Sequence, residues 1–340
     1  MKNRLSTYNR GFWHRPEHWI ETLRIKMNKA TIMMAAALLC LVACGPKKGG
    51  ESGPRQGGNI EIDKDADSTF VRLKQEALGK FKQLTFNDPQ TGKTMEYNLL
   101  VPEGYDGTQG YPLVLFMADA STVGKEVTAP LTQGYGALEF ASDRDQRLHP
   151  SFVLVPQYTD WAVQDDWSTT DEVEMTIRLL AEVCRQYNVD TNRLYTTGQS
   201  MGGMMSFYFN IVHPDLFAAS LFVSSQWDTK KMQDFGQKHF FYIVAGGDQK
   251  ASGGMQGLAK VLKENDARVD SASWSAKLPA EEQERLAEEL IARGSDINFI
   301  RWKTGSVLPE TGRAMEHIAS FDYGYKLAAV RDWLFKQSKE

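Results

Sequence analysis

A serine flanked by glycines is the part of this sequence whose residue types and spacing point most directly to chemistry. Gly198, Ser200 and Gly202 form the pattern Gly-x-Ser-x-Gly. A serine lifted clear of a strand end needs a strained turn, and side chains two positions to either side of it would collide with neighbouring backbone. Glycine at these two positions removes the side chains. The pattern therefore nominates Ser200 as a nucleophile.

The surrounding residues decide between this interpretation and a glycine-rich turn without chemistry. Residues 193–197, Arg-Leu-Tyr-Thr-Thr, are expected to form a strand. Met204, Met205 and Tyr208 lie near helical spacing, which predicts a helix over 201–211. A strand, a tight turn and a helix follow one another where a nucleophilic serine of this kind is found. We therefore favour the chemical interpretation.

The rest of the chain predicts the layers that would position this serine. Segments 80–87 and 93–101 flank a turn and are expected to pair as an antiparallel hairpin. After them, short apolar runs alternate with helical patterns, which is typical of parallel strands joined by helices. The expected strands are 112–117, 152–155, 193–197, 218–223, 240–245 and 297–303, and the expected helices are 171–187, 201–211, 255–265, 280–293 and 323–336. The sequence predicts an α/β fold with a doubly wound, mostly parallel sheet.

Within this framework the chain resembles the α/β-hydrolase superfamily, and in particular the secreted esterases grouped with polyhydroxybutyrate depolymerases, feruloyl esterases and predicted lipoprotein peptidases. The resemblance covers about residues 80–336, and its most specific parts are 190–195, 198–203 and 213–219. It implies the α/β-hydrolase fold over residues 60–340 as one catalytic domain. It also implies a triad whose members follow in the chain order serine, acid, histidine.

This chain order leaves one candidate for the general base. Only His317 follows both the serine and the expected acid, on an expected loop before the C-terminal helix. The other histidines lie in the leader, before the serine, at the end of its helix or before the acid: His14, His18, His149, His213 and His239.

The acid is expected at Asp248, where a buried strand runs into a Gly-Gly turn and where the family keeps its triad acid. A carboxylate there would orient the imidazole of His317 and stabilise the imidazolium. One alternative is that Asp248 is a turn residue that satisfies local amides. The others are that Asp228, or after it Asp322, is the acid.

A tetrahedral intermediate needs backbone donors aimed at its oxyanion. The resemblance implies the Met201 amide as one donor and a second donor after strand 112–117, where the family carries a His-Gly motif. Ala-Asp-Ala-Ser at 118–121 stands there instead, so Ala120 is expected to donate without the usual glycine. Asp119 also brings a carboxylate near a site of developing negative charge. This departure motivates an alternative, a non-catalytic glycan-binding lipoprotein.

Three tryptophans are expected to bind substrate. Trp161 and Trp167 lie on the loop after strand 152–155, and Trp227 follows strand 218–223. Loops at the carboxyl ends of parallel strands line the ligand crevice of α/β proteins, where an indole can stack on a sugar or a phenolic ring. The alternative is that these side chains pack their loops down.

The N-terminal part predicts export and lipidation. Residues 33–43 form a short apolar run after basic residues, which is typical of a secretory signal and too short for a comfortable membrane span. The run is followed by Cys44 in a Leu-Val-Ala-Cys segment that resembles the lipobox of bacterial lipoproteins. Translation is expected to begin at Met27, and residues 1–43 to be the leader and signal peptide. An ordinary signal peptide or a membrane anchor that ends near a cysteine is the alternative.

Lipid on Cys44 would hold the protein to a membrane of the bacterial cell envelope, facing the periplasm or the surface. Residues 44–59, rich in Gly, Pro and charge, are expected to be a flexible tether. Cys184, which shares a helical stripe with apolar residues, is expected to be a core residue and not a reactive thiol.

Composition narrows the function classes. The chain of 340 residues is 42% hydrophobic and 24% charged, which is typical of globular domains. Its net charge of −4 does not favour binding to nucleic acid. No cofactor or metal is expected, because the histidines lack paired spacing and the glycines lack the dinucleotide pattern. The sequence predicts a serine carboxylic-ester hydrolase that acts through an acyl-enzyme on Ser200, with acyl or feruloyl esters of polysaccharides as expected substrates. A serine peptidase of the same fold is the alternative enzyme.

Overall fold

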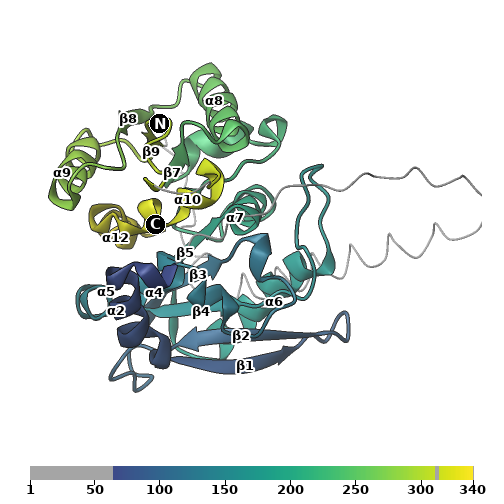
Figure 1. The fold of residues 1–340 in the computed structure, drawn as a ribbon. Helices are drawn as coiled ribbons and strands as arrows, with labels where there is room; N and C mark the ends of the chain where they lie inside the picture. The colour runs from purple at the N-terminus through teal and green to yellow at the C-terminus, as the bar shows by residue number, and fades with distance from the viewer. Residues whose placement is uncertain (1–63, 311–313, 340) are drawn as a thin grey trace, which may run out of the picture. The chain divides into compact units, whose positions relative to one another are not determined.

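A nine-stranded sheet forms the centre of the protein, and the strand that leads to Ser200 is its middle member (Figure 1). The computed structural model describes residues 64–310 and 314–339. The predicted signal peptide, Cys44, the tether and the domain boundaries that they define lie outside the described residues. The strand order is β1-β2-β4-β3-β5-β6-β7-β9-β8. Pairs β1·β2 and β2·β4 are antiparallel and the other neighbouring pairs are parallel, which confirms the predicted doubly wound sheet with an N-terminal hairpin.

The strands are β1 Phe81–Asn87, β2 Thr94–Leu100, β3 Tyr111–Met117, β4 Phe152–Pro156, β5 Val189–Gln199, β6 Ala219–Val223, β7 Phe240–Ala245, β8 Asp270–Trp274 and β9 Ile297–Trp302. The α-helices are α2 Ser68–Ala77, α3 Ala129–Thr132, α4 Tyr135–Phe140, α5 Asp143–Leu148, α6 Asp171–Gln186, α7 Met201–Val212, α8 Gln249–Glu264, α9 Ala280–Ile291, α10 Glu316–Ala319, α11 Phe321–Lys326 and α12 Ala328–Phe335. The 3-10 helices are η1 Lys64–Ala66, η2 Leu78–Lys80, η3 Ala120–Thr122, η4 Thr229–Lys231 and η5 Gln233–Gln237.

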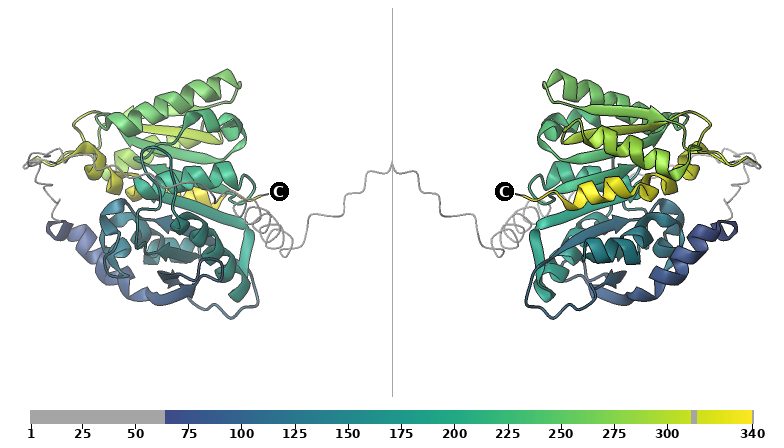
Figure 2. Two further views of the ribbon diagram at one scale, coloured as in Figure 1. Left: turned by 90° about the vertical axis from the view of Figure 1, so that its right-hand side faces the viewer. Right: turned by 90° about the vertical axis from the view of Figure 1, so that its left-hand side faces the viewer.

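Helices cover both faces of the sheet, which is why strands such as β3 and β7 consist almost entirely of buried apolar residues. In β3, residues 113–117 are all buried. Residues of α2, α4, α9 and α12 share one core with alternate strand residues such as Val114 and Phe116. Helices α6, α7 and α8 lie on the opposite side in Figure 1. The views in Figure 2 show the N-terminal elements, in blue, at one end of the sheet and the green elements near β8 at the other.

Several elements differ from the prediction for local reasons. Helix α8 begins six residues before the predicted start at 255, because the Asp248 side chain caps it by accepting a hydrogen bond from the Ala251 amide. The predicted helix 323–336 is two helices, since Leu327 leaves the helical conformation between α11 and α12. Sequence patterns did not predict β8, an edge strand with exposed residues, or the helices α2, α3, α4 and α5. No helix in the described part of the chain is long and apolar enough to cross a membrane.

Candidate active site

Ser200 lies in a sharp turn between β5 and α7. Its backbone has φ 51° and ψ −116°, a conformation that residues other than glycine rarely adopt. A Cβ atom on Gly198 would lie 2.4 Å from the Gly202 carbonyl carbon, and one on Gly202 would lie 2.0 Å from the Met117 carbonyl oxygen. Both glycines are therefore needed to let the turn pack against itself and against the end of β3.

His317 joins Ser200 to Asp248. The His317 Nε2 atom lies 2.8 Å from the Ser200 Oγ atom, and the Nδ1 atom lies 2.6 Å from the Asp248 Oδ2 atom. A carboxylate can only accept, so Nδ1 carries the proton and Nε2 is left to accept the Ser200 hydroxyl. The Asp248 side chain is 5% exposed and that of His317 is 31% exposed. The site thus holds a buried carboxylate, an oriented imidazole within reach of solvent and a serine hydroxyl in one hydrogen-bonded chain.

Asp248 makes the contacts expected of both alternatives, the turn residue and the partner of His317. Its Oδ1 atom accepts from the Ala251 amide at 3.1 Å, and its Oδ2 atom accepts from His317. Beneath this turn the Tyr242 hydroxyl donates to the Ala251 carbonyl at 3.1 Å. Burial, and after it the Asp248 charge, raises the pKa of Tyr242 well above its ordinary value, so the hydroxyl remains a donor.

The alternative acids lie elsewhere. Asp228 caps η4 by accepting from the Lys230 amide at 3.1 Å, and Asp322 accepts from the Tyr135 amide at 3.1 Å. The other described histidines also have separate surroundings: His149 pairs with Asp332, His213 follows α7, and His239 contacts Gln337.

The sequence predicts a loop at His317, whereas the structure places this residue in the four-residue helix α10. Two residues near His317, Ser320 and Glu316, hold α10 in place through hydrogen bonds that no sequence pattern predicted. Ser320 donates to the His317 carbonyl oxygen at 2.8 Å, and its Oγ atom also lies 2.5 Å from the Ser224 Oγ atom. The Glu316 carboxylate accepts from the Gly247 amide at 2.9 Å and from the Gly305 amide at 2.7 Å. Glu316 therefore ties the segment that carries the histidine to the turn that carries Asp248.

Replacement of Glu316 is expected to displace His317 from Asp248. We expect Glu316→Ala to lower kcat about tenfold to a hundredfold with little change in KM, because a misplaced catalytic group costs rate more than binding. Glu316→Gln, which keeps one acceptor oxygen, should recover part of that loss. Steady-state kinetics on a soluble ester measures both, and Glu281→Ala, in the first turn of α9, is the control. Equal kcat values for wild type and Glu316→Ala would contradict this positioning role.

Met201 and Ala120, whose backbone amides are predicted oxyanion donors, each begin a helix. Met201 is the first residue of α7 and Ala120 is the first residue of η3, so neither amide has an acceptor within its own helix. The end of β3, which leads to Ala120, pairs with the end of β5 through Met117 and Gly198. Asp119 is buried, and its side chain is turned toward the Ser121 amide and the Gln133 side chain.

The three predicted substrate-binding tryptophans differ in exposure. Trp161 is 47% exposed, whereas Trp227 is 3% exposed and packs between Trp167 and Tyr208, with ring centroids 5.4 and 5.6 Å away. Trp167 has a φ of 70°. Trp227 is therefore buried against Trp167 and Tyr208, whereas the Trp161 indole is exposed to solvent.

The loop that carries Trp161 and Trp167 is braced at two places. The Glu172 carboxylate accepts from the Thr159 amide at 3.0 Å, and Asp165 pairs with Lys250 at 2.5 Å. Lys250 lies at the start of α8, beside Asp248. The first contact holds the loop to α6, and the second holds it to α8, the helix that follows Asp248.

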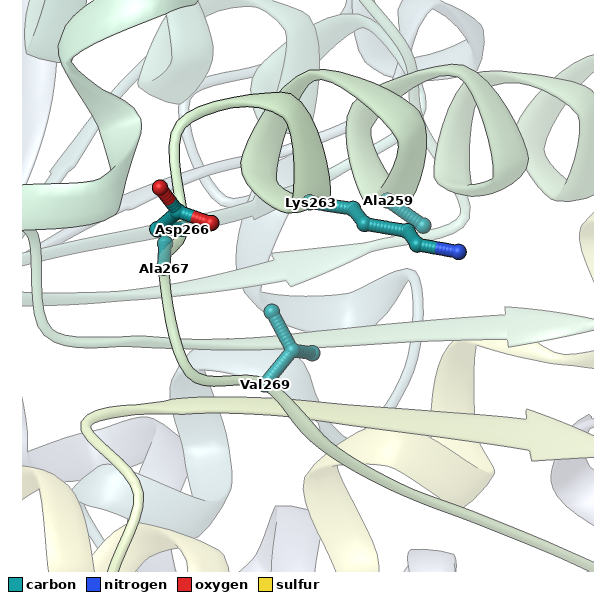
Figure 3. Close-up of a pocket in the computed structure, with 5 residues that line it drawn as sticks. All are labelled: Ala259, Lys263, Asp266, Ala267 and Val269. Carbon is teal, nitrogen blue, oxygen red and sulfur yellow. The ribbon is translucent and has the colours of Figure 1, made fainter.

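A shallow pocket of about 350 Å³ lies at the other end of α8 (Figure 3). Its lining residues come from the last turns of the helix and the segment that leads to β8: Ala259, Lys263, Asp266, Ala267 and Val269. Helix α8 has 16 residues, a length of about 24 Å, so this pocket is remote from Asp248. The described residues hold no cluster of side chains that could bind a metal ion. Burial raises the pKa of the partly buried Cys184 thiol to about 12, which makes it a poor nucleophile.

No protein-family model and no curated protein matches this chain. Among solved structures, a thermostable esterase is 25% identical in sequence with a TM-score of 0.63, over 77% of this chain and 64% of that one. This chain therefore spans slightly less than two thirds of that esterase. A ferulic acid esterase (12% identity, TM-score 0.48) and an S-formylglutathione hydrolase from Staphylococcus aureus (14%, 0.44) each align with 75% of this chain and 98% of their own.

The fold is the α/β-hydrolase fold. The strand order, the position of Ser200 after the central strand and the likeness to the thermostable esterase agree on this. With a serine, an imidazole and a carboxylate in one chain of hydrogen bonds, the site has the geometry of a serine hydrolase.

Proposed function

We propose that the protein is a serine carboxylic-ester hydrolase in which Ser200 is the nucleophile, His317 the general base and Asp248 the residue that orients it. The observation that carries the proposal is the pair of contacts from His317, 2.8 Å to Ser200 and 2.6 Å to Asp248. The fold that the chain shares with a thermostable esterase supports it.

Acylation begins when the Ser200 Oγ atom bonds to the ester carbonyl carbon and its proton passes to His317 Nε2. The carbonyl π electrons move to oxygen, and the amides of Met201 and Ala120 donate to this oxyanion. When the carbonyl re-forms, the bond to the alcohol oxygen breaks and His317 gives that oxygen its proton. The alcohol leaves and the acyl group remains on Ser200.

Deacylation repeats these steps with water. A water molecule gives one proton to His317 while its oxygen bonds to the acyl carbon. The bond between that carbon and Ser200 Oγ then breaks, and the oxygen recovers the proton from His317. The 31% exposure of the His317 side chain gives water the access that this step requires.

The substrate class that we propose is an acyl or feruloyl ester of a polysaccharide. Trp161, at 47% exposure, offers an indole face to a sugar or phenolic ring, and Trp167 on the same loop packs against Trp227, which follows β6. A panel of p-nitrophenyl acyl esters, feruloyl oligosaccharides and fluorogenic peptides tests this class. Turnover of esters without peptides is expected. Turnover of peptides alone would make the protein a peptidase, and glycan binding with no turnover would favour the non-catalytic alternative.

We also propose that Cys44 carries lipid and holds the protein to the bacterial cell envelope. The Leu-Val-Ala-Cys segment that ends the apolar run supports this proposal.

Lipidation of Cys44 predicts that a cell culture fed an alkyne fatty acid labels the protein, and that Cys44→Ala removes the label. Cys184→Ala is the matched control and should remain labelled, because Cys184 is a partly buried residue of α6. Ester turnover by the purified protein should be the same in both variants. Label that persists in Cys44→Ala would rule out this site.

A further inference from the structure

We propose that Asp119 is a positioning residue that fixes the second oxyanion donor, the Ala120 amide, and thereby replaces the glycine motif that is absent from this loop. The inference rests on the proposed function and adds to it a residue with no direct part in bond making. It assigns a role to a carboxylate whose place next to a developing negative charge is otherwise unfavourable.

The Asp119 side chain shapes the turn that follows β3. Asp119 is extended, with φ −77° and ψ 171°, and its Oδ1 atom accepts from the Ser121 amide at 2.6 Å. Its carbonyl oxygen accepts from the Thr122 amide at 3.3 Å and from the Thr122 hydroxyl at 3.0 Å. The Val123 amide donates to the Ala120 carbonyl oxygen at 3.3 Å.

These bonds engage the amides of residues 121–123 inside the turn. The Ala120 amide precedes them as the first of η3, and the turn offers it no acceptor. An aspartate side chain can stabilise a tight turn by accepting from a nearby amide in place of a backbone acceptor. A turn held in this way does not need a glycine. The Ala120 N–H is therefore held ready without glycine.

Gln133 links this turn to the nucleophile turn. Its Nε2 group donates to Asp119 Oδ2, and its Oε1 atom accepts from the Asp119 amide at 3.3 Å and from Gln199 Nε2 at 2.9 Å. Gln199 immediately precedes Ser200 and is 2% exposed. The cluster of Asp119, Gln133 and Gln199 thus sets the distance between the Ala120 amide and the nucleophile.

The same contacts turn the carboxylate charge away from the oxyanion. The donors to Asp119 are the Ser121 amide and the side-chain amides of Gln133 and Gln199, the last at 3.4 Å. Gln199 Oε1 is buried with no partner among the described residues, which is unfavourable. In this orientation of the Gln199 amide, the Nε2 group donates to Asp119 and Gln133, and the Oε1 atom is left without a partner among the described residues.

The first test compares Asp119→Ala with a matched variant. Asp106 accepts from the Thr108 amide at 2.9 Å in a turn before β3, at the opposite end of that strand. Asp119→Ala is expected to lower kcat about a hundredfold with KM within about threefold, the loss that follows removal of an oxyanion donor. Asp106→Ala should leave kcat unchanged. Asp119→Asn keeps an acceptor for the Ser121 amide, so its loss should not exceed about tenfold.

Phenylboronic acid provides a readout that a general loss of folding would not produce. Its boron accepts the Ser200 oxygen and places a boron-bound oxygen where the oxyanion forms, so its inhibition constant should rise in Asp119→Ala by the same factor as kcat falls. The double variant Asp119→Ala with Gln133→Ala should lose little beyond Asp119→Ala, because both act through one cluster.

The outcomes separate this inference from the proposed function. If Asp119→Ala has the kcat and the boronate affinity of wild type while Ser200 remains essential, the positioning role is wrong and the function stands. A uniform loss in Asp119→Ala and Asp119→Asn, with unchanged boronate affinity, would also overturn it. Ester turnover that does not depend on Ser200 would overturn the proposed function itself.

Discussion

Ser200→Ala is expected to lower kcat for ester hydrolysis by about 10⁴- to 10⁶-fold, with KM nearly unchanged. The variant lacks the atom that forms the acyl-enzyme. Among the described residues, Ser200 is the only nucleophile in hydrogen-bond contact with His317 Nε2, which lies 2.8 Å from its Oγ atom. The catalysis that remains would come from the oxyanion donors and from substrate binding.

The measurement pairs steady-state turnover of a p-nitrophenyl ester with labelling by a fluorophosphonate, which reacts only with an activated serine. Ser225→Ala is the matched control, because its Oγ atom is buried with no hydrogen-bond partner among the described residues and its removal breaks no bond. Labelling of wild type and Ser225→Ala, but not of Ser200→Ala, is the expected pattern. Full turnover by Ser200→Ala would refute the acyl-enzyme mechanism.

The sequence carried enough information to predict the sheet and the members of the hydrogen-bonded chain. Apolar runs of four to six residues predicted β3, β4 and β7 within one residue at either end, because strands buried on both faces leave little room for polar residues. The family resemblance implied the chain order of Ser200, Asp248 and His317, and the structure brings these three side chains together. Their catalytic roles remain a prediction that the Ser200→Ala experiment tests.

No sequence pattern predicted the contacts that hold these side chains in place. Glu316 binds the amides of Gly247 and Gly305, and Asp119 binds the amide of Ser121; all three partners are backbone groups. Hydrophobic periodicity and motifs depend on side-chain types. A side chain that accepts a hydrogen bond from a backbone amide therefore leaves no pattern in the sequence. Sequence alone also cannot show that Trp227 is 3% exposed and packs against Trp167, so its contact with substrate stays a prediction.

Gly202→Ala is expected to destabilise the fold and the active site together. Its Cβ atom would lie 2.0 Å from the Met117 carbonyl oxygen, 2.4 Å from the Met117 carbonyl carbon and 2.7 Å from the Ala118 carbonyl oxygen. These are backbone atoms of β3 and of the residue that follows it, so no side chain can rotate to make room. We expect the free energy of unfolding to fall by about 3 kcal/mol, the upper part of the range for overpacked cores. The backbone that must move leads to Ala120, so kcat should also fall about a hundredfold.

Gly253→Ala separates this effect from the general consequences of replacing a helical glycine. Gly253 lies in α8, and a Cβ atom there would have nothing within 4 Å. Alanine favours the helix over glycine, so this variant should gain about 0.5 to 1 kcal/mol of stability and keep its activity. Urea unfolding and ester turnover of the two variants are the measurements. The prediction would be wrong if Gly202→Ala unfolded at the wild-type urea concentration and kept the wild-type kcat. In that case β3 and α7 could move apart without loss of stability or activity. The glycine would then not be what holds Ser200 against the oxyanion loop.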